Sequence, residues 1–214
     1  LMEYPEDPVR DRRERVRSMQ AQIDLIKRIV PQIDGIHDIG ATEPEECFLA
    51  MSMDVPMLPS TFNLLFKKPQ IIWDWDLTTM YKNYYEVLQL LSSQQGTGDD
   101  KRWVLKSPAH LGFIDYIAKA FPGCKIIWTH RDPCQSIPSL CSLFRVFVEM
   151  FYAGNVKLDE VGKNCSKFWE AMLERADKSF AATDVQSEHV RYEEFIKDPV
   201  GMVKGLYRGF GWEV

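Results

Sequence analysis

The fold is decided by residues 125–133, KIIWTHRDP. Residues 125–129 have the composition of a buried strand, and Pro133 suits the first turn of a helix that should run to about Tyr152. Upstream, residues 103–105 (WVL) predict another short strand, and the helical pattern of residues 111–121 connects the two. Because strands joined by a helix of this length lie parallel, the sequence predicts a βαβ unit.

Apolar residues at intervals of three and four predict further helices along the chain. These cover residues 10–30, 76–93, 162–182 and 192–210, the last broken at Asp198-Pro199. A third short strand is expected at residues 188–191. Thr42 and Glu45 have the spacing of a capping box, which predicts a short helix from Cys47. With no repeat and no linker visible, residues 1–214 are expected to form a single domain.

Composition limits the class of protein. The net charge is −5 and 45% of the residues are hydrophobic, which fits a globular protein and argues against a nucleic-acid partner. The five cysteines have no metal-site spacing, so neither zinc nor a disulfide framework is expected. No membrane span and no signal peptide are visible, so we expect a cytoplasmic protein. The chain opens like the middle of a protein, and a missing segment could hold an anchor.

Two cations follow the first two predicted strands. Lys106 comes after residues 103–105 and Arg131 after residues 125–129, so both should face a crevice at the carboxyl ends of the strands. The helix that starts at Pro133 would present free N–H groups to an anion there. Ser139, eight residues after Arg131, could donate its hydroxyl to the same group. A surface ion pair between Arg131 and Asp132 beside a helix cap fits this element equally well.

The segment from Trp103 to Ser139 resembles the bacterial-type branch of the sulfotransferases that use 3′-phosphoadenosine 5′-phosphosulfate. The resemblance rests on LKSPAH at residues 105–110, FPG at 121–123 and THRDP at 129–133. It extends to residues 39–47 and to the segment VRYEEF at 190–195. It implies a three-layer α/β/α, helix-rich fold with a parallel sheet, like the P-loop nucleotide kinases.

The resemblance also implies roles for individual residues. Arg131 and Ser139 match the residues that hold the 3′-phosphate of the donor, and Tyr192 matches a tyrosine beside the adenine. Lys106 matches a lysine near the sulfuryl group. His110 is a candidate catalytic base, although it follows the lysine by four residues where soluble eukaryotic relatives have two. The alternative for His110 is a histidine that caps or packs at a helix start.

The implied reaction moves a sulfuryl group to a hydroxyl or amine of a small-molecule, lipid or glycan acceptor, without a metal. The Gly/Ser/Thr-rich phosphosulfate loop of the family has no counterpart in this sequence, which suggests an N-terminally incomplete chain. A degenerate, non-catalytic binding or scaffold protein is therefore the alternative. A nucleotide kinase would need a phosphate loop with lysine. A protein kinase is excluded because no asparagine lies five residues after Asp132.

Overall fold

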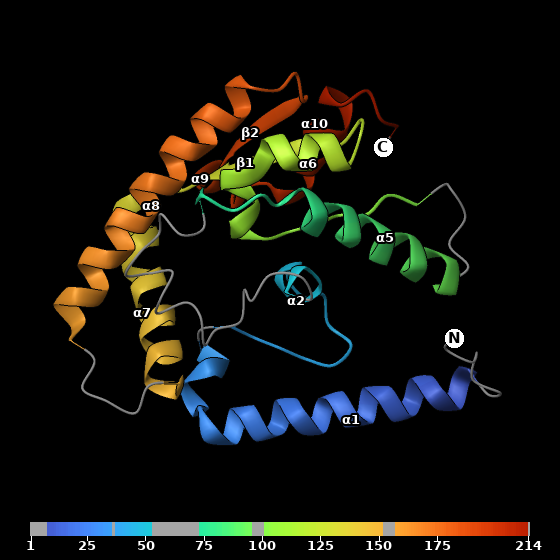
Figure 1. Ribbon diagram of the computed structural model, residues 1–214, viewed down its shortest axis with the longest axis vertical. Coiled ribbons are helices and arrows are strands. Elements are labelled where there is room, and N and C mark those ends of the chain that lie inside the picture. Colours follow the sequence, from blue (N-terminus) through green and yellow to red (C-terminus); the bar gives the residue numbers. More distant parts are fainter. Residues whose placement is uncertain (1–7, 36, 53–72, 96–100, 152–156, 214) are drawn as a thin grey trace.

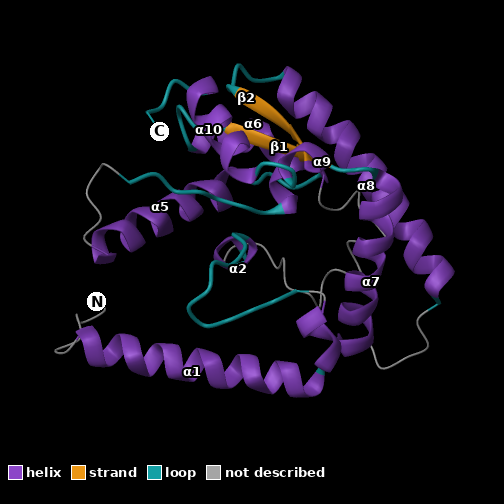
Figure 2. Cartoon of the chain, turned by 180° about the vertical axis from the view of Figure 1, so that it is seen from behind, coloured by secondary structure: helices purple, strands orange, loops and turns teal. Residues whose placement is uncertain are grey.

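The computed structural model describes residues 8–35, 37–52, 73–95, 101–151 and 157–213. In chain order their elements are α1 (Pro8–Ile29), the 3-10 helix η1 (Pro31–Gly35), α2 (Phe48–Met51), α5 (Thr78–Gln95), the 3-10 helix η2 (Pro108–Phe113), α6 (Ile114–Ala120), β1 (Ile126–His130), α7 (Pro133–Phe151), α8 (Leu158–Ala181), β2 (Ser187–Arg191), α9 (Tyr192–Phe195) and α10 (Pro199–Gly209). The fold is helix-rich α/β. Figures 1 and 2 place the sheet with α6, α8 and α10 at one end and α1 at the other.

The sheet of the described residues consists of β1 and β2, which run parallel. The register pairs Ile126 with Ser187 at one end and His130 with Arg191 at the other. Both strands confirm the predictions from residues 125–129 and 188–191. In Figure 2 the two arrows point the same way, toward α9, so the carboxyl ends of both strands meet at one edge.

The prediction of a strand at residues 103–105 is wrong. These residues have no regular secondary structure, and Val104 is 86% exposed. A strand is stabilised by backbone hydrogen bonds to a neighbouring strand. At the end of this segment, however, the Lys106 carbonyl accepts a bond of 2.9 Å from the Cys47 N–H instead. The observed parallel pair is therefore β1 with β2, and not residues 103–105 with β1.

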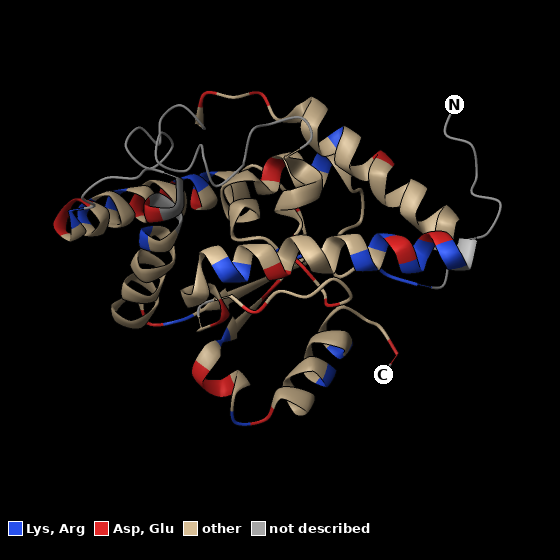
Figure 3. Ribbon diagram, turned by 90° about the horizontal axis from the view of Figure 1, so that it is seen from below, with Lys and Arg blue, Asp and Glu red and all other residues tan. Residues whose placement is uncertain are grey.

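The helices form where the apolar periodicity predicts them, and the charged faces lie in solvent. Along the first half of α1, basic and acidic residues alternate (Figure 3), and Arg10 pairs with Glu14 at 3.0 Å. No helix among the described residues combines the length and hydropathy that a bilayer span needs. The sequence also predicts irregular structure at residues 54–75, and this segment lies mostly outside the described residues.

The core forms where α2, α5, η2 and α6 pack together. α5 supplies Met80, Tyr84 and Leu88 to it, with Leu77 just before the helix, and Tyr81 is 0% exposed. α8 packs on η2 and α7. Ser179 of α8 donates a hydrogen bond of 2.6 Å to the Asp115 carboxylate. This packing fixes the position of η2, which follows Lys106.

Candidate functional site

The two residues that follow the strands, Arg131 after β1 and Tyr192 after β2, lie against each other. Because the register pairs His130 with Arg191, the next residue of each strand reaches the same edge of the sheet. The guanidinium carbon of Arg131 stands 4.5 Å from the centroid of the Tyr192 ring, a cation–π distance. Both side chains are exposed. Arg131 thus carries a planar set of N–H donors, the kind of group that recognises phosphate, at an exposed position beside an aromatic ring.

The start of α7 is already partly capped. The Asp132 carboxylate accepts a hydrogen bond of 2.8 Å from the Cys134 N–H, and the Asp132 carbonyl accepts from Gln135 and Ser136. The expected row of free N–H groups is therefore reduced by this aspartate. Ser139 lies exposed on α7, about 9 Å along the helix axis from Pro133. The structure does not bring the Ser139 hydroxyl into contact with Arg131, and its phosphate-binding role stays a prediction.

Lys106 is held in place by its backbone. Its N–H donates to the Cys47 sulfur at 3.0 Å, and its carbonyl accepts from the Cys47 N–H. Cys47 is buried, so this pair of bonds anchors residue 106 to the start of α2. The ammonium group of Lys106 is exposed and forms an ion pair with the Glu46 carboxylate. Lys106 thus presents a positive charge from a fixed backbone position.

The predicted capping box of Thr42 and Glu45 does not form. Glu45 does not reach back to Thr42. Its carboxylate lies 3.1 Å from the His37 Nε2 and accepts 2.7 Å from the Glu46 N–H. The short helix α2 does form, but its N-cap residue Cys47 makes no side-chain capping bond. The two neighbouring glutamates therefore serve different partners.

His110 lies in η2, whose first turn is capped by the Ser107 hydroxyl. Its Nδ1 is 3.1 Å from the Tyr81 hydroxyl, and its Nε2 is buried without a hydrogen-bond partner. Burial lowers the pKa of His110 to about 4, because the charged ring loses its hydration. The ring is therefore neutral near pH 7. Neutrality suits a base, whereas an enclosed Nε2 fits the packing alternative.

A second histidine, His130, lies in β1 and packs against other rings of the sheet. His130 Nε2 lies 2.7 Å from His189 Nδ1, and the two rings stack at 4.9 Å. Trp128 stacks on His130 on the same face of β1 and in turn on Phe180 of α8. Burial and the neighbouring His189 lower the pKa of His130. This aromatic cluster packs α8 against the sheet and keeps His130 away from the face of Arg131.

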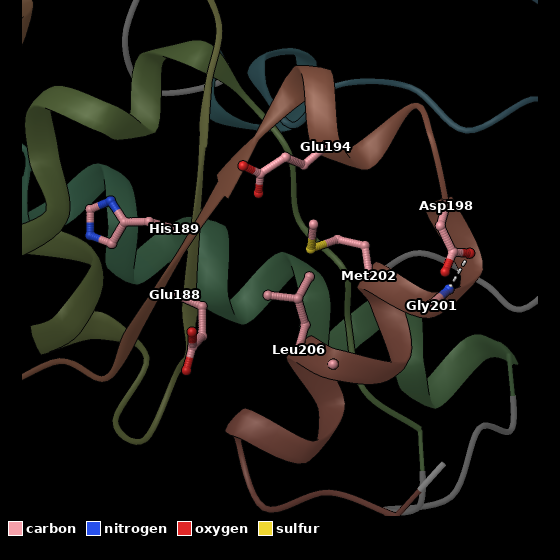
Figure 4. Close-up of a pocket in the computed structure, with 8 residues that line it drawn as sticks. Glu188, His189, Glu194, Asp198, Gly201, Met202 and Leu206 are labelled. Carbon is pink, nitrogen blue, oxygen red and sulfur yellow. Dashed lines mark hydrogen bonds between the residues drawn. The ribbon is translucent and has the colours of Figure 1, made fainter.

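One cavity of the described residues, about 350 Å³ in volume, lies between β2, α9 and α10. Figure 4 shows carboxylates from Glu188, Glu194 and Asp198 around the apolar side chains of Met202 and Leu206. Asp198 is committed to capping α10, since it accepts 2.9 Å from the Gly201 N–H. Three carboxylates repel an anion, so this cavity does not extend the Arg131 site.

Four of the five predicted site residues therefore form two groups, and Ser139 belongs to neither. Arg131 and Tyr192 are in contact at the sheet edge. Lys106 and His110 lie at the start of η2. Among the described residues, no hydrogen bond or ion pair joins the two groups, and no three His, Cys, Asp or Glu side chains gather as a metal would need. Sequence reasoning missed Glu46, because a contact between residues 60 positions apart leaves no periodic signal.

Comparisons with known proteins place these features in a family. The profile described as "Sulfotransferase family" matches residues 1–214. The omega-hydroxy-beta-dihydromenaquinone-9 sulfotransferase Stf3 of Mycobacterium bovis is 26% identical over 112 residues, 52% of this chain and 29% of that protein. The Mycobacterium tuberculosis protein of the same name matches equally.

Solved structures agree with the fold. Sulfotransferase STF1 from Mycobacterium tuberculosis superposes with a TM-score of 0.70 at 27% identity, over 92% of this chain and 53% of that one. Sulfotransferase STF9 from Mycobacterium avium has a TM-score of 0.66 at 22% identity and covers 94% of this chain and 53% of its own, and at that identity supports the fold alone. The chain thus spans about half the length of these solved structures.

Proposed function

Because the chain belongs to the sulfotransferase family, we propose that it transfers a sulfuryl group from 3′-phosphoadenosine 5′-phosphosulfate to a hydroxyl or amine of an acceptor. The proposal includes a three-layer, nucleotide-kinase-like architecture in which the β1–β2 pair is one part of a larger parallel sheet. Donor and acceptor are substrates, and the chemistry needs no resident metal.

The contact between Arg131 and Tyr192 carries the proposal. The donor has a 3′-phosphate and an adenine at one end, so a fork of N–H donors beside an aromatic ring fits that end. Tyr192 keeps 37% of its surface exposed, which leaves ring area for a base. We assign the 3′-phosphate to Arg131, with Ser139 as a second donor, and the adenine to Tyr192.

Lys106 would act at the other end of the donor. During transfer, charge spreads over the sulfuryl oxygens and the leaving oxygen, so a cation placed beside them stabilises the transition state more than the ground state. The Cys47 bonds hold the Lys106 backbone still, which makes such positioning effective.

The acceptor is proposed more broadly. Stf3 is named for a hydroxylated dihydromenaquinone, so a lipid hydroxyl is the acceptor class to test first, followed by small phenols and amino sugars. The acceptor must lose a proton as it attacks. His110 is neutral near pH 7, as a base must be, and stays a prediction for that step.

Calorimetry with adenosine 3′,5′-bisphosphate, the product of the donor, tests the assignment of Arg131. In the full-length protein, Arg131→Ala should weaken binding by about 10- to 100-fold, because charge-assisted hydrogen bonds are lost. Arg145→Ala is the matched control, since Arg145 lies on α7 and pairs with Glu149 one turn later on the same helix. Equal affinities for wild type and Arg131→Ala would refute the site. Binding without transfer to any acceptor would favour the non-catalytic alternative.

A further inference from the structure

Glu46 is the carboxylate that meets Lys106. Its side chain is 20% exposed, against 68% for the lysine. The Glu46 side chain is therefore mostly covered by protein but still accessible from solvent. The backbone brings the two side chains close together, because residues 47 and 106 are joined by the two bonds that anchor the lysine. Glu46 precedes Cys47 and is carried to Lys106 by the same anchor.

The alternative base is placed differently. His110 has its Nδ1 against Tyr81 and its Nε2 enclosed, so no nitrogen of the ring faces the surface where Lys106 stands. Glu45 is engaged by His37 and by the Glu46 backbone. A base must come within hydrogen-bond reach of the proton that it removes. Among the described residues, Glu46 is the one whose carboxylate pairs with the Lys106 ammonium, the group that we assign to the sulfuryl end of the donor.

We propose that Glu46 is the general base of the transfer, an inference that rests on the proposed function. The acceptor oxygen attacks sulfur as its O–H proton passes to the Glu46 carboxylate. The new oxygen–sulfur bond forms as the bond from sulfur to the bridging oxygen of the 5′-phosphate breaks. That oxygen leaves with the electron pair, and Lys106 offsets its charge. Sulfated acceptor and adenosine 3′,5′-bisphosphate are released, and Glu46 later returns the proton to water.

The ion pair also explains how the resting site is kept ready. Without donor, Glu46 and Lys106 satisfy each other's charge. When the anionic sulfuryl group approaches, the ammonium turns toward it and the carboxylate becomes available to the acceptor hydroxyl. One cation for the leaving charge and one carboxylate for the proton are the two groups that an in-line displacement uses.

The test uses the full-length protein with sulfur-35-labelled donor and three probe acceptors: farnesol, 4-nitrophenol and glucosamine. Glu46→Gln removes the proton acceptor with little change in shape. We expect kcat to fall about 100-fold or more, with the KM for donor within about threefold of wild type, as expected for an interaction made only in the transition state. Glu46→Asp should recover part of kcat. Glu45→Gln is the matched control and should keep wild-type kcat.

Each other outcome overturns the proposal. A Glu46→Gln variant with more than about a third of wild-type kcat shows that another group takes the proton. A loss that falls on the KM for donor, with kcat kept, shows that Glu46 only positions Lys106. Wild type that neither binds adenosine 3′,5′-bisphosphate nor transfers label refutes the proposed function itself. Wild-type transfer with an active Glu46→Gln variant refutes only the role of Glu46.

Discussion

The edge of the sheet and the start of η2 hold their functional side chains in different ways. Arg131 and Tyr192 are exposed and touch only because two parallel strands end together. His110 is packed against Tyr81, a fully buried residue of α5. Binding groups at a surface edge can be altered at little cost to folding, whereas groups set into the core cannot. Substitutions should therefore separate the two regions by what they change.

The largest effect should come from Tyr81→Ala. The variant removes a ring at the centre of the core and the partner of His110, so the free energy of unfolding should fall by about 3–5 kcal/mol. Urea denaturation followed by circular dichroism measures it. Arg131→Ala, measured in parallel, should change stability by less than about 0.5 kcal/mol. Similar losses for the two variants would mean that the regions do not differ as described.

The pH dependence of stability sharpens the same contrast. The folded-state pKa of His110, about 4, lies below the ordinary value of 6.5, so the fold favours the neutral ring. The contribution of the neutral His110 ring to the free energy of unfolding is therefore complete above about pH 6.5. It is lost as the pH falls toward 4, by roughly 3 kcal/mol in all.

The measurement compares the free energy of unfolding of wild type and His110→Gln at pH 7.5, 5.5 and 4.5. The difference between the two proteins should shrink as the pH falls, because glutamine does not titrate. A difference that stays constant with pH would show that the His110 ring is not enclosed in solution. Other carboxylates and histidines titrate in both proteins and cancel in the comparison.

The smallest effect belongs to the sheet edge. Tyr192→Ala should weaken binding of adenosine 3′,5′-bisphosphate by about two- to fivefold, because an exposed cation–π contact contributes about 0.5–1 kcal/mol. Tyr192→Phe keeps the ring face and should bind like wild type. Calorimetry measures both variants. Equal losses for alanine and phenylalanine would assign the effect to the hydroxyl rather than to the ring beside Arg131.

Local sequence was enough for the elements that carry the site. The apolar run at residues 125–129 predicts β1, the short strand expected at residues 188–191 is β2, and Pro133 after a short polar turn predicts the start of α7. The strand expected at residues 103–105 failed, because an apolar run becomes a strand only beside a partner. The Lys106 end of that run is held by Cys47. The prediction of a capping box was wrong for a similar reason, because the Glu45 carboxylate pairs with His37, eight residues earlier.

By itself, the sequence determined which residue types follow each strand and helix start, because backbone periodicity and turn chemistry act over a few neighbouring residues. It thus predicted Lys106 and Arg131 after the expected strands, with Ser139 eight residues after the arginine, and the resemblance to the sulfotransferase family added Tyr192 and His110 as candidates. Only the tertiary structure decided which side chains these residues contact. The parallel register set Arg131 on Tyr192, α5 enclosed His110, and the Cys47 anchor brought Glu46 to Lys106 across 60 residues. Such contacts depend on how distant elements pack, and no local pattern encodes that.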